Sequence, residues 1–92
     1  MSQSAVRRVE FDADAARDLR KLGATAERAI LPYLRERIAT SEDPRRFGKP
    51  LTGDLKGLWR YCVTDYRIVA AIEDDRFVVL VVTVGHRRQV YD

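Results

Sequence analysis

Two strand-like segments separated by a very short connection constrain the fold of this chain more than any other feature. Residues 59–63 and 66–72 are rich in aromatic and β-branched side chains, and only Thr64 and Asp65 lie between them. A connection of that length predicts an antiparallel hairpin. Counted outward from the turn, the predicted cross-strand pairs are Val63 with Tyr66, Cys62 with Arg67, Tyr61 with Ile68, and Arg60 with Val69.

The predicted hairpin has one apolar face and one basic face, because side chains alternate between the two sides of a strand. The residues expected on the apolar face are Trp59, Tyr61, Val63, Tyr66, Ile68, Ala70 and Ile72. Such a face is suited to burial beneath helices. Arg60, Cys62 and Arg67 share the opposite face.

A short strand and a short helix are predicted before the hairpin. Residues 5–11 alternate in the manner of a strand with one mostly apolar side. In the helix that follows, Asp12 or Asp14 can cap the first turn, and Gly23 is placed to end the last one.

A second helix is predicted over residues 25–40, where apolar side chains recur at helical spacing along one stripe. Pro32 lies inside this segment and has no N–H to donate, so a kink or a break is expected there. Residues 42–50 are predicted to form a charged loop bounded by prolines, and residues 77–84 a central strand buried on both faces.

These elements, in the order β-α-α-β-β-β, predict an α+β fold. The sheet is small, curved and mainly antiparallel, and both helices pack on one of its faces. With 92 residues, no internal repeat and no linker, the chain is expected to form a single domain over residues 1–92.

Composition excludes several classes of protein. Cys62 is the sole cysteine, so an internal disulfide is impossible, and neither a zinc-type spacing nor a glycine-rich phosphate loop is present. Neither a signal peptide nor an apolar run of about 20 residues occurs, so we expect a cytoplasmic protein with no metal, no cofactor and no membrane contact. The net charge is only +3, but 14 of the 17 basic residues are arginine, which suits bidentate phosphate contacts.

The second half of the chain carries groups that suit RNA cleavage without a metal. That reaction needs cations for the charged transition state and groups that move protons. The candidate cations are Lys49, Lys56, Arg60, Arg67, Arg87 and Arg88, and the candidate titratable or stacking groups are His86 and Tyr91. Taken singly, each has an ordinary alternative interpretation as a solvated surface residue.

Motifs in residues 47–91 carry a family resemblance. They read Phe-Gly-Lys-Pro-Leu at 47–51, Leu-Lys-Gly-Leu-Trp-Arg-Tyr at 55–61, Asp-Tyr-Arg-Ile-Val at 65–69 and Val-Gly-His-Arg-Arg-Gln-Val-Tyr at 84–91. Their order resembles the RelE/ParE superfamily of toxins of type II toxin–antitoxin systems, and the ending looks more like the RelE-type messenger-RNA interferases. The resemblance implies a RelE-like fold and a metal-free endoribonuclease that inhibits translation by cutting messenger RNA on the 70S ribosome. It also implies a cognate RelB-like antitoxin and a toxin–antitoxin hetero-oligomer.

The resemblance also assigns roles to individual residues. Arg60 is similar to the first strand cation, Arg67 to the arginine that clamps phosphate, Arg87 to the transition-state cation or acid, and Tyr91 to the tyrosine that stacks on a base. His86 resembles a histidine that some relatives use as the acid or base. Lys49, Lys56 and Arg88 are expected to bind RNA, and an alternative alignment makes Arg88 the critical arginine.

Cys62 departs from the family pattern. Relatives commonly carry Lys or Arg at this strand position, whereas a thiol supplies no positive charge in either protonation state. This difference predicts attenuated nuclease activity. Two other functions therefore stay open: a ParE-type inhibitor of DNA gyrase on the same fold, and a weakly active or inactive protein that binds only antitoxin or RNA.

Overall fold

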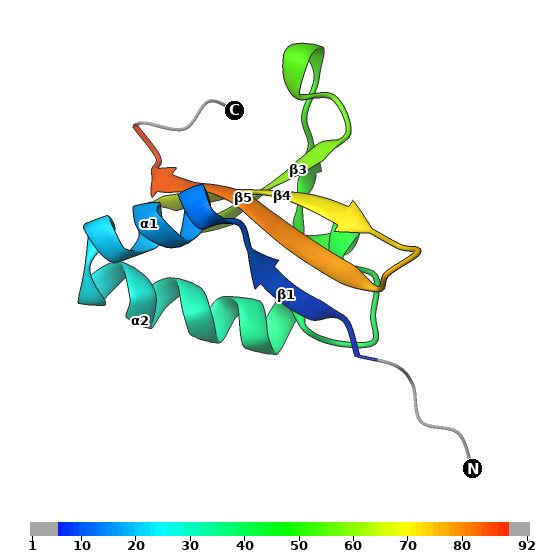
Figure 1. Ribbon diagram of the computed structural model, residues 1–92, viewed down its shortest axis with the longest axis horizontal. Helices are drawn as coiled ribbons and strands as arrows, with labels where there is room; N and C mark the ends of the chain where they lie inside the picture. The colour runs from blue at the N-terminus through cyan, green and yellow to red at the C-terminus, as the bar shows by residue number, and fades with distance from the viewer. Residues whose placement is uncertain (1–5, 89–92) are drawn as a thin grey trace.

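A mixed sheet of five strands forms the centre of the computed structural model, which describes residues 6–88 (Figure 1). The strands are β1 (Arg8–Phe11), β2 (Lys49–Pro50), β3 (Leu58–Val63), β4 (Tyr66–Glu73) and β5 (Val78–His86). They lie in the order β1-β5-β4-β3-β2, with β1 parallel to β5 and every other neighbouring pair antiparallel. The predicted α+β class and mainly antiparallel sheet are confirmed.

The first helix, α1 (Ala13–Leu22), begins and ends at residues that the sequence indicates. The Asp12 carboxylate accepts a hydrogen bond from the Ala15 N–H at 2.8 Å, which resolves the choice between two candidate caps. Gly23 ends the helix with a φ of 91°, in the left-handed region that glycine adopts without steric cost. The same residue precedes α2 (Ala24–Tyr33).

A kink or a break is expected at Pro32, and the α-helix does end one residue later, at Tyr33, although the chain does not leave its helical path. The helical path continues beyond α2 through a π-helical segment, Leu34–Ile38, which is closed by a 2.8 Å hydrogen bond from the Ala39 N–H to the Leu34 carbonyl (Figure 1). Ile30, Leu34 and Ile38 are all buried. Burial on both sides of the proline holds the two segments on one path, so the chain changes its hydrogen-bond spacing instead of breaking.

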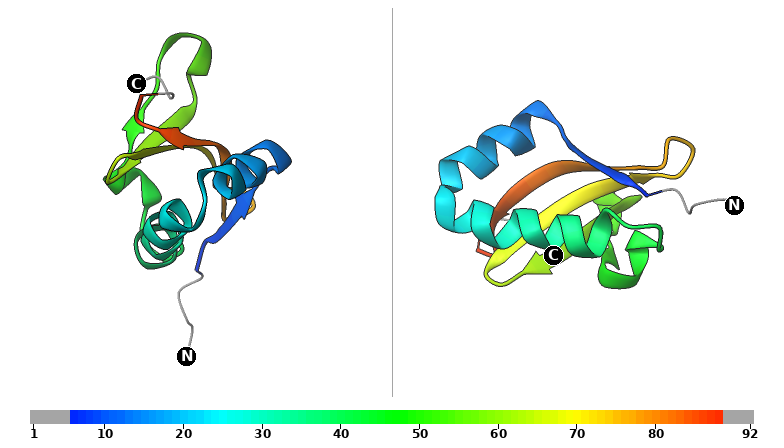
Figure 2. Two further views of the ribbon diagram at one scale, coloured as in Figure 1. Left: turned by 90° about the vertical axis from the view of Figure 1, so that its left-hand side faces the viewer. Right: turned by 90° about the horizontal axis from the view of Figure 1, so that it is seen from below.

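The predicted hairpin register is confirmed in all four pairs, and two further pairs extend it to Leu58. Both helices lie against one side of the sheet (Figure 2). The buried core on that side includes Tyr61, Val63, Ile68 and Ala70, with the remaining members of the predicted apolar face packed at its margin. None of the helices within residues 6–88 is long and apolar enough to cross a membrane.

Residues 42–50 are more ordered than the predicted loop. Asp43 caps a 3-10 helix, Pro44–Phe47, by accepting from the Arg45 N–H at 3.0 Å. The buried Tyr61 hydroxyl donates to the Pro44 carbonyl at 2.9 Å. These contacts bring the chain alongside β3, where Lys49 and Pro50 form the edge strand β2 that the sequence prediction missed.

The last strand lies inside the sheet, as predicted, but Leu80, Val82 and Thr83 are only partly buried, and the strand continues two residues beyond Val84. Val78, Val79 and Val81 are fully buried. The pairing with β4 contains a β-bulge: Ala70 faces Val81 and the adjacent Val69 faces Thr83, so Val82 is the extra residue.

Candidate functional site

Two neighbouring rows of residues carry positive charge on the helix-free face of the sheet. In the first row, Lys49 of β2 lies opposite Arg60 of β3. In the second, Cys62 lies opposite Arg67 of β4, which in turn faces Gly85 of β5. Residues paired across strands point to the same face, so the structure brings Lys49, Arg60 and Arg67 together.

The three cations differ in exposure. The Arg60 residue retains only 8% of its accessible surface, Arg67 is partly buried, and Lys49 is exposed. Like charges opposite one another in a sheet are destabilising. Guanidinium and ammonium groups gathered on one face of a sheet are suited to binding a phosphate.

Arg87 lies at the same end of the sheet, beside the β3–β4 turn. Its backbone N–H donates to the Asp65 carbonyl at 2.7 Å, and its Nη1 lies 3.7 Å from a carboxylate oxygen of Asp65. Both side chains are more than half exposed. An exposed ion pair of this kind contributes about 0 to 1 kcal/mol, so Arg87 can exchange Asp65 for a phosphate at small cost. Arg88, the next residue, is also exposed.

His86 lies on the other side of the sheet. It pairs with Tyr66, whose side chain belongs to the helix-covered face, and the two rings meet edge to face with centroids 6.0 Å apart. The bulge at Val82 causes this placement, because one extra residue reverses the face of everything that follows it. With unbroken pairing, His86 would lie opposite Asp65 on the face of Arg67.

The remaining predicted site residues are dispersed. Lys56 is exposed in the connection between β2 and β3, which projects on the side of the sheet away from the helices (Figures 1 and 2). Tyr91 lies outside the described residues. Within residues 6–88, no three His, Cys, Asp or Glu side chains gather in a way that could hold a metal ion.

The sequence prediction missed an ionic cluster that holds in place the 3-10 helix preceding β2. Arg45 donates to Asp74 at 2.6 Å and to Asp43 at 3.1 Å, and Arg7 reaches Asp74 at 3.1 Å. These contacts join the N-terminal segment, the 3-10 helix and the β4–β5 turn. The one sequence signal was the Asp43-Pro44 pair, which is typical of a helical start.

The pKa shifts of the residues in that cluster are consistent with these ion pairs. The hydrogen bond from Arg45 holds the pKa of Asp74 below its ordinary value, and the backbone N–H of Arg45 does the same for Asp43. Arg45 in turn has a raised pKa, chiefly through its bond to Asp74. Burial raises the pKa of Tyr61, so its hydroxyl stays protonated and able to donate to the Pro44 carbonyl.

Comparison with known proteins places this geometry in a family. A model described as the ParE toxin of type II toxin–antitoxin system, parDE, matches residues 9–91. Toxin RelE of Mycobacterium tuberculosis strain H37Rv is 35% identical over 83 residues, which cover 90% of this chain and 84% of that protein. Toxin RelG of the same organism is 32% identical over 83 residues, covering 90% of this chain and 93% of that protein.

A solved structure gives the same result. The toxin–antitoxin complex RelBE2 of Mycobacterium tuberculosis contains a chain that superposes with a TM-score of 0.82 at 29% identity. The match covers 95% of this chain and 98% of the other.

Proposed function

The chain belongs to the ParE toxin family of type II toxin–antitoxin systems, within the RelE/ParE superfamily, and we propose that it inhibits translation by cutting messenger RNA on the ribosome. The observation that carries the proposal is the register that sets Arg60, Arg67 and Lys49 together on the helix-free face. Similarity to relatives named RelE and RelG supports a nuclease over a gyrase inhibitor. Residues 1–92 then form a single cytoplasmic toxin domain.

The proposed reaction uses the RNA's own ribose as nucleophile and needs no metal or cofactor. The 2′-OH loses its proton and attacks the adjacent phosphorus, and the 5′-oxygen of the next nucleotide leaves and takes up a proton. The products are a 2′,3′-cyclic phosphate and a 5′-hydroxyl. Between them lies a phosphorane whose extra negative charge guanidinium groups can stabilise.

Each site residue has a proposed role in this scheme. Arg67 clamps the phosphate, Arg60 supplies fixed positive charge beside it, and Arg87 stabilises the transition state or donates the proton. His86 is the second candidate for proton transfer and Tyr91 stacks on a base. The RNA backbone is bound by Lys49, Lys56 and Arg88.

The geometry favours Arg87 over His86 for proton donation. Arg87 contacts Asp65, two residues before Arg67, whereas His86 packs against Tyr66 on the helix side. Cys62 faces Arg67 where a further cation would otherwise lie, so the activity is attenuated relative to a site with Lys or Arg there.

The proposed physiological partner is a cognate RelB-like antitoxin that binds the toxin in a hetero-oligomer. The 29%-identical solved structure is itself described as a toxin–antitoxin complex. A nuclease directed at its own cell's messages must be held inactive until it is released, and tight binding by a second protein meets that need.

Expression in cells without antitoxin tests the function. We expect amino-acid incorporation to stop first in pulse labelling, and mapped messages to show new 5′-hydroxyl ends within translated regions. Arg67→Ala, which removes the clamp, serves as the control. Normal incorporation together with loss of DNA supercoiling would identify gyrase as the target and overturn the proposal.

A further inference from the structure

Removal of the 2′-OH proton needs an acceptor beside the reacting phosphate. A general base must lie within hydrogen-bond reach of that hydroxyl, at about 2.6 to 3.2 Å. The arginines and lysines of the proposed site cannot serve, because a charged guanidinium or ammonium group has donors and no acceptor. The reaction therefore needs one more side chain, close to Arg67 and Arg87.

Asp65 supplies a carboxylate at this position. It belongs to the β3–β4 turn, and only Tyr66 separates it from Arg67 along the chain. One of its carboxylate oxygens lies 3.7 Å from Arg87 Nη1, and its carbonyl accepts a hydrogen bond from the Arg87 N–H at 2.7 Å. The Asp65 side chain is 64% exposed, so an RNA ribose can reach it.

The other candidate acceptors near the site are less suitable. The Cys62 thiol is exposed opposite Arg67, but sulfur is a weak hydrogen-bond acceptor. The His86 ring packs edge to face on Tyr66, on the helix side of the sheet. An ionised carboxylate has two acceptor oxygens and no proton of its own to displace.

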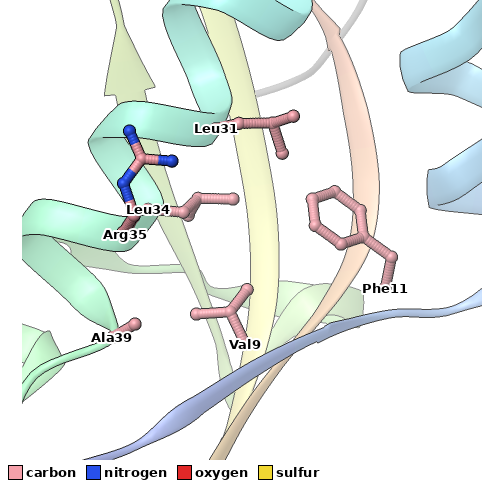
Figure 3. Close-up of a pocket in the computed structure, with 6 residues that line it drawn as sticks. All are labelled: Val9, Phe11, Leu31, Leu34, Arg35 and Ala39. Atoms are coloured by element: carbon pink, nitrogen blue, oxygen red, sulfur yellow. The ribbon is translucent and has the colours of Figure 1, made fainter.

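Two hollows on the helix side offer no alternative. A groove of about 330 Å³ between β1 and the α2 side is lined by Val9, Phe11, Leu31, Leu34, Arg35 and Ala39. Figure 3 shows these side chains, and the single charged one among them is the cation Arg35. A second hollow includes the Asp18 carboxylate, but it lies between α1 and Val84, whose side chain belongs to the helix-covered core.

We propose that Asp65 is the general base of the cleavage reaction and takes the proton from the ribose 2′-OH. The assignment rests on the proposed function, because it concerns the same site and the same reaction. It adds a catalytic residue of negative charge to a site otherwise built from cations.

Substrate binding releases the carboxylate for this task. The incoming phosphate takes the place of Asp65 beside Arg87, and an exposed ion pair is lost at small cost. The carboxylate then accepts the 2′-OH proton while the bond from O2′ to phosphorus forms and the bond from phosphorus to O5′ breaks. The leaving O5′ takes a proton from Arg87 or from water, and Asp65 afterwards gives its proton to water.

The first test is Asp65→Asn, which keeps the size of the side chain and suits a turn but removes the basic oxygen. We expect single-turnover cleavage of ribosome-bound message, at saturating toxin, to fall at least about 100-fold. Asp65→Glu restores a carboxylate and should cleave at least about tenfold faster than Asp65→Asn. Asp14→Asn is the matched control, because Asp14 is also exposed and pairs with an arginine, Arg17, at 3.3 Å. It should cleave as the wild type does.

A message that binds but cannot react separates chemistry from positioning. A single 2′-deoxyribose at the mapped cleavage position removes the nucleophile. Asp65→Asn should bind this message as tightly as wild type, or up to about threefold more tightly, because a charge of the same sign as the phosphate is gone. A loss of affinity as large as the loss of rate would show that Asp65 only shapes the turn, and would overturn the assignment.

A substrate with sulfur in place of the leaving 5′-oxygen identifies the proton that Asp65 moves. A thiolate is a weaker base than an alkoxide and leaves without taking up a proton. Asp65→Asn should stay about 100-fold slower than wild type on this substrate, because the 2′-OH must still lose its proton. Recovery of the wild-type rate would show that Asp65 acts through Arg87 on the leaving group. That result would overturn the assignment, as would near-wild-type cleavage of ordinary message by Asp65→Asn.

Failure of the nuclease proposal is recognised separately. Cleavage by the wild type and by Asp14→Asn tests the proposed function without reference to Asp65. If neither protein cuts ribosome-bound message, the function and the assignment of Asp65 both fail.

Discussion

Arg67 and Arg87 differ from the other arginines of the chain in position, not in chemistry. Each is close to the β3–β4 turn, one on the strand that follows it and the other on the turn after β5. A cation directed at developing phosphorane charge contributes about 3 to 4 kcal/mol, whereas an exposed ion pair contributes about 0 to 1. Their position near the β3–β4 turn therefore predicts that these two arginines contribute more to RNA cleavage than the other arginines do.

We expect Arg67→Ala and Arg87→Ala each to lower cleavage of ribosome-bound message by about 100-fold or more. Arg67→Ala should mainly weaken substrate binding, and Arg87→Ala should mainly slow the single-turnover rate. Arg17→Ala is the matched control, because Arg17 is 56% exposed against 53% for Arg87 and also pairs with an aspartate. Near-wild-type cleavage by both site variants would show that Arg67 and Arg87 take no part in the reaction.

His86 provides a separate comparison at the same end of β5. Because its ring packs on Tyr66 on the helix side, His86→Ala should reduce the cleavage rate less than Arg87→Ala does. Single-turnover kinetics of the two variants in parallel measure the difference. If His86→Ala proves the slower enzyme, the histidine must reach the reacting phosphate despite the face on which it lies.

Cys62→Arg should produce a faster nuclease. Cys62 is exposed and faces Arg67, so a guanidinium at this position would join the existing cations on the helix-free face. Added repulsion should lower the free energy of unfolding by about 1 kcal/mol, while transition-state stabilisation can raise the rate up to about 100-fold. Cys62→Ser, which adds no charge, should match the parent. An unchanged rate in a folded Cys62→Arg protein would contradict the role assigned to this position.

At the scale of elements, β2 is held in place by contacts far from it in sequence. The Arg45–Asp74 pair and the Tyr61 hydroxyl fix the 3-10 helix just before it. Gly48 comes directly after that helix and lies against the Tyr61 ring. A Cβ at this position would lie 3.0 Å from Tyr61 Cε1. Lys49 thus reaches its place opposite Arg60 through the packing of these neighbours.

Acid should weaken this support. The bonds from Arg45 and Arg7 hold the pKa of Asp74 below 3.8, so the stability they contribute is present above that pH and is lost as the pH falls through the lower folded-state value. We expect Asp74→Asn to melt below wild type at neutral pH, with the difference shrinking in acid below pH 3.8. Asp75→Asn, a change at the adjacent exposed residue, should melt as wild type does. A constant difference at all pH values would show that the charge of Asp74 is not what stabilises the fold.

The elements show why some features were predictable from sequence and others were not. The β3–β4 register follows from local information, namely a two-residue turn and alternating side chains, and it placed Arg60 and Arg67 on one face correctly. β2 has only two residues, one of them proline, so it has no periodicity to detect. The bulge at Val82 lies within an unbroken run of apolar residues, where no alternation marks a change of face, and this is why the side of His86 could not be predicted.

At the scale of the whole molecule, the two faces of the sheet have different surroundings. The helix-free face carries Arg60, Arg67 and Lys49. The other face is covered by α1 and α2 (Figure 2). The net charge of +3 is too small to attract RNA strongly by itself. Binding must therefore depend on where the charges lie.

The dependence of RNA binding on the position of these charges can be measured by varying the salt concentration. Each phosphate neutralised on single-stranded RNA releases counterions, so the slope of log K against log salt concentration changes by about 0.7 for each contact removed. We expect Arg67→Ala and Lys49→Ala each to reduce the slope for a single-stranded oligoribonucleotide by about that amount between about 50 and 200 mM salt. Fluorescence anisotropy titrations provide the measurement.

Arg35→Ala is the control for this experiment, because it removes the same unit of charge from the groove on the helix side. If the helix-free face binds the RNA, the Arg35 variant keeps the wild-type slope and loses only the small, uniform attraction that follows from a lower net charge. Equal reductions in slope for Arg35→Ala and Arg67→Ala would instead mean that RNA contacts both faces. In that case RNA binding would not depend on the helix-free face alone, and the roles proposed for Arg67 and Lys49 would fail.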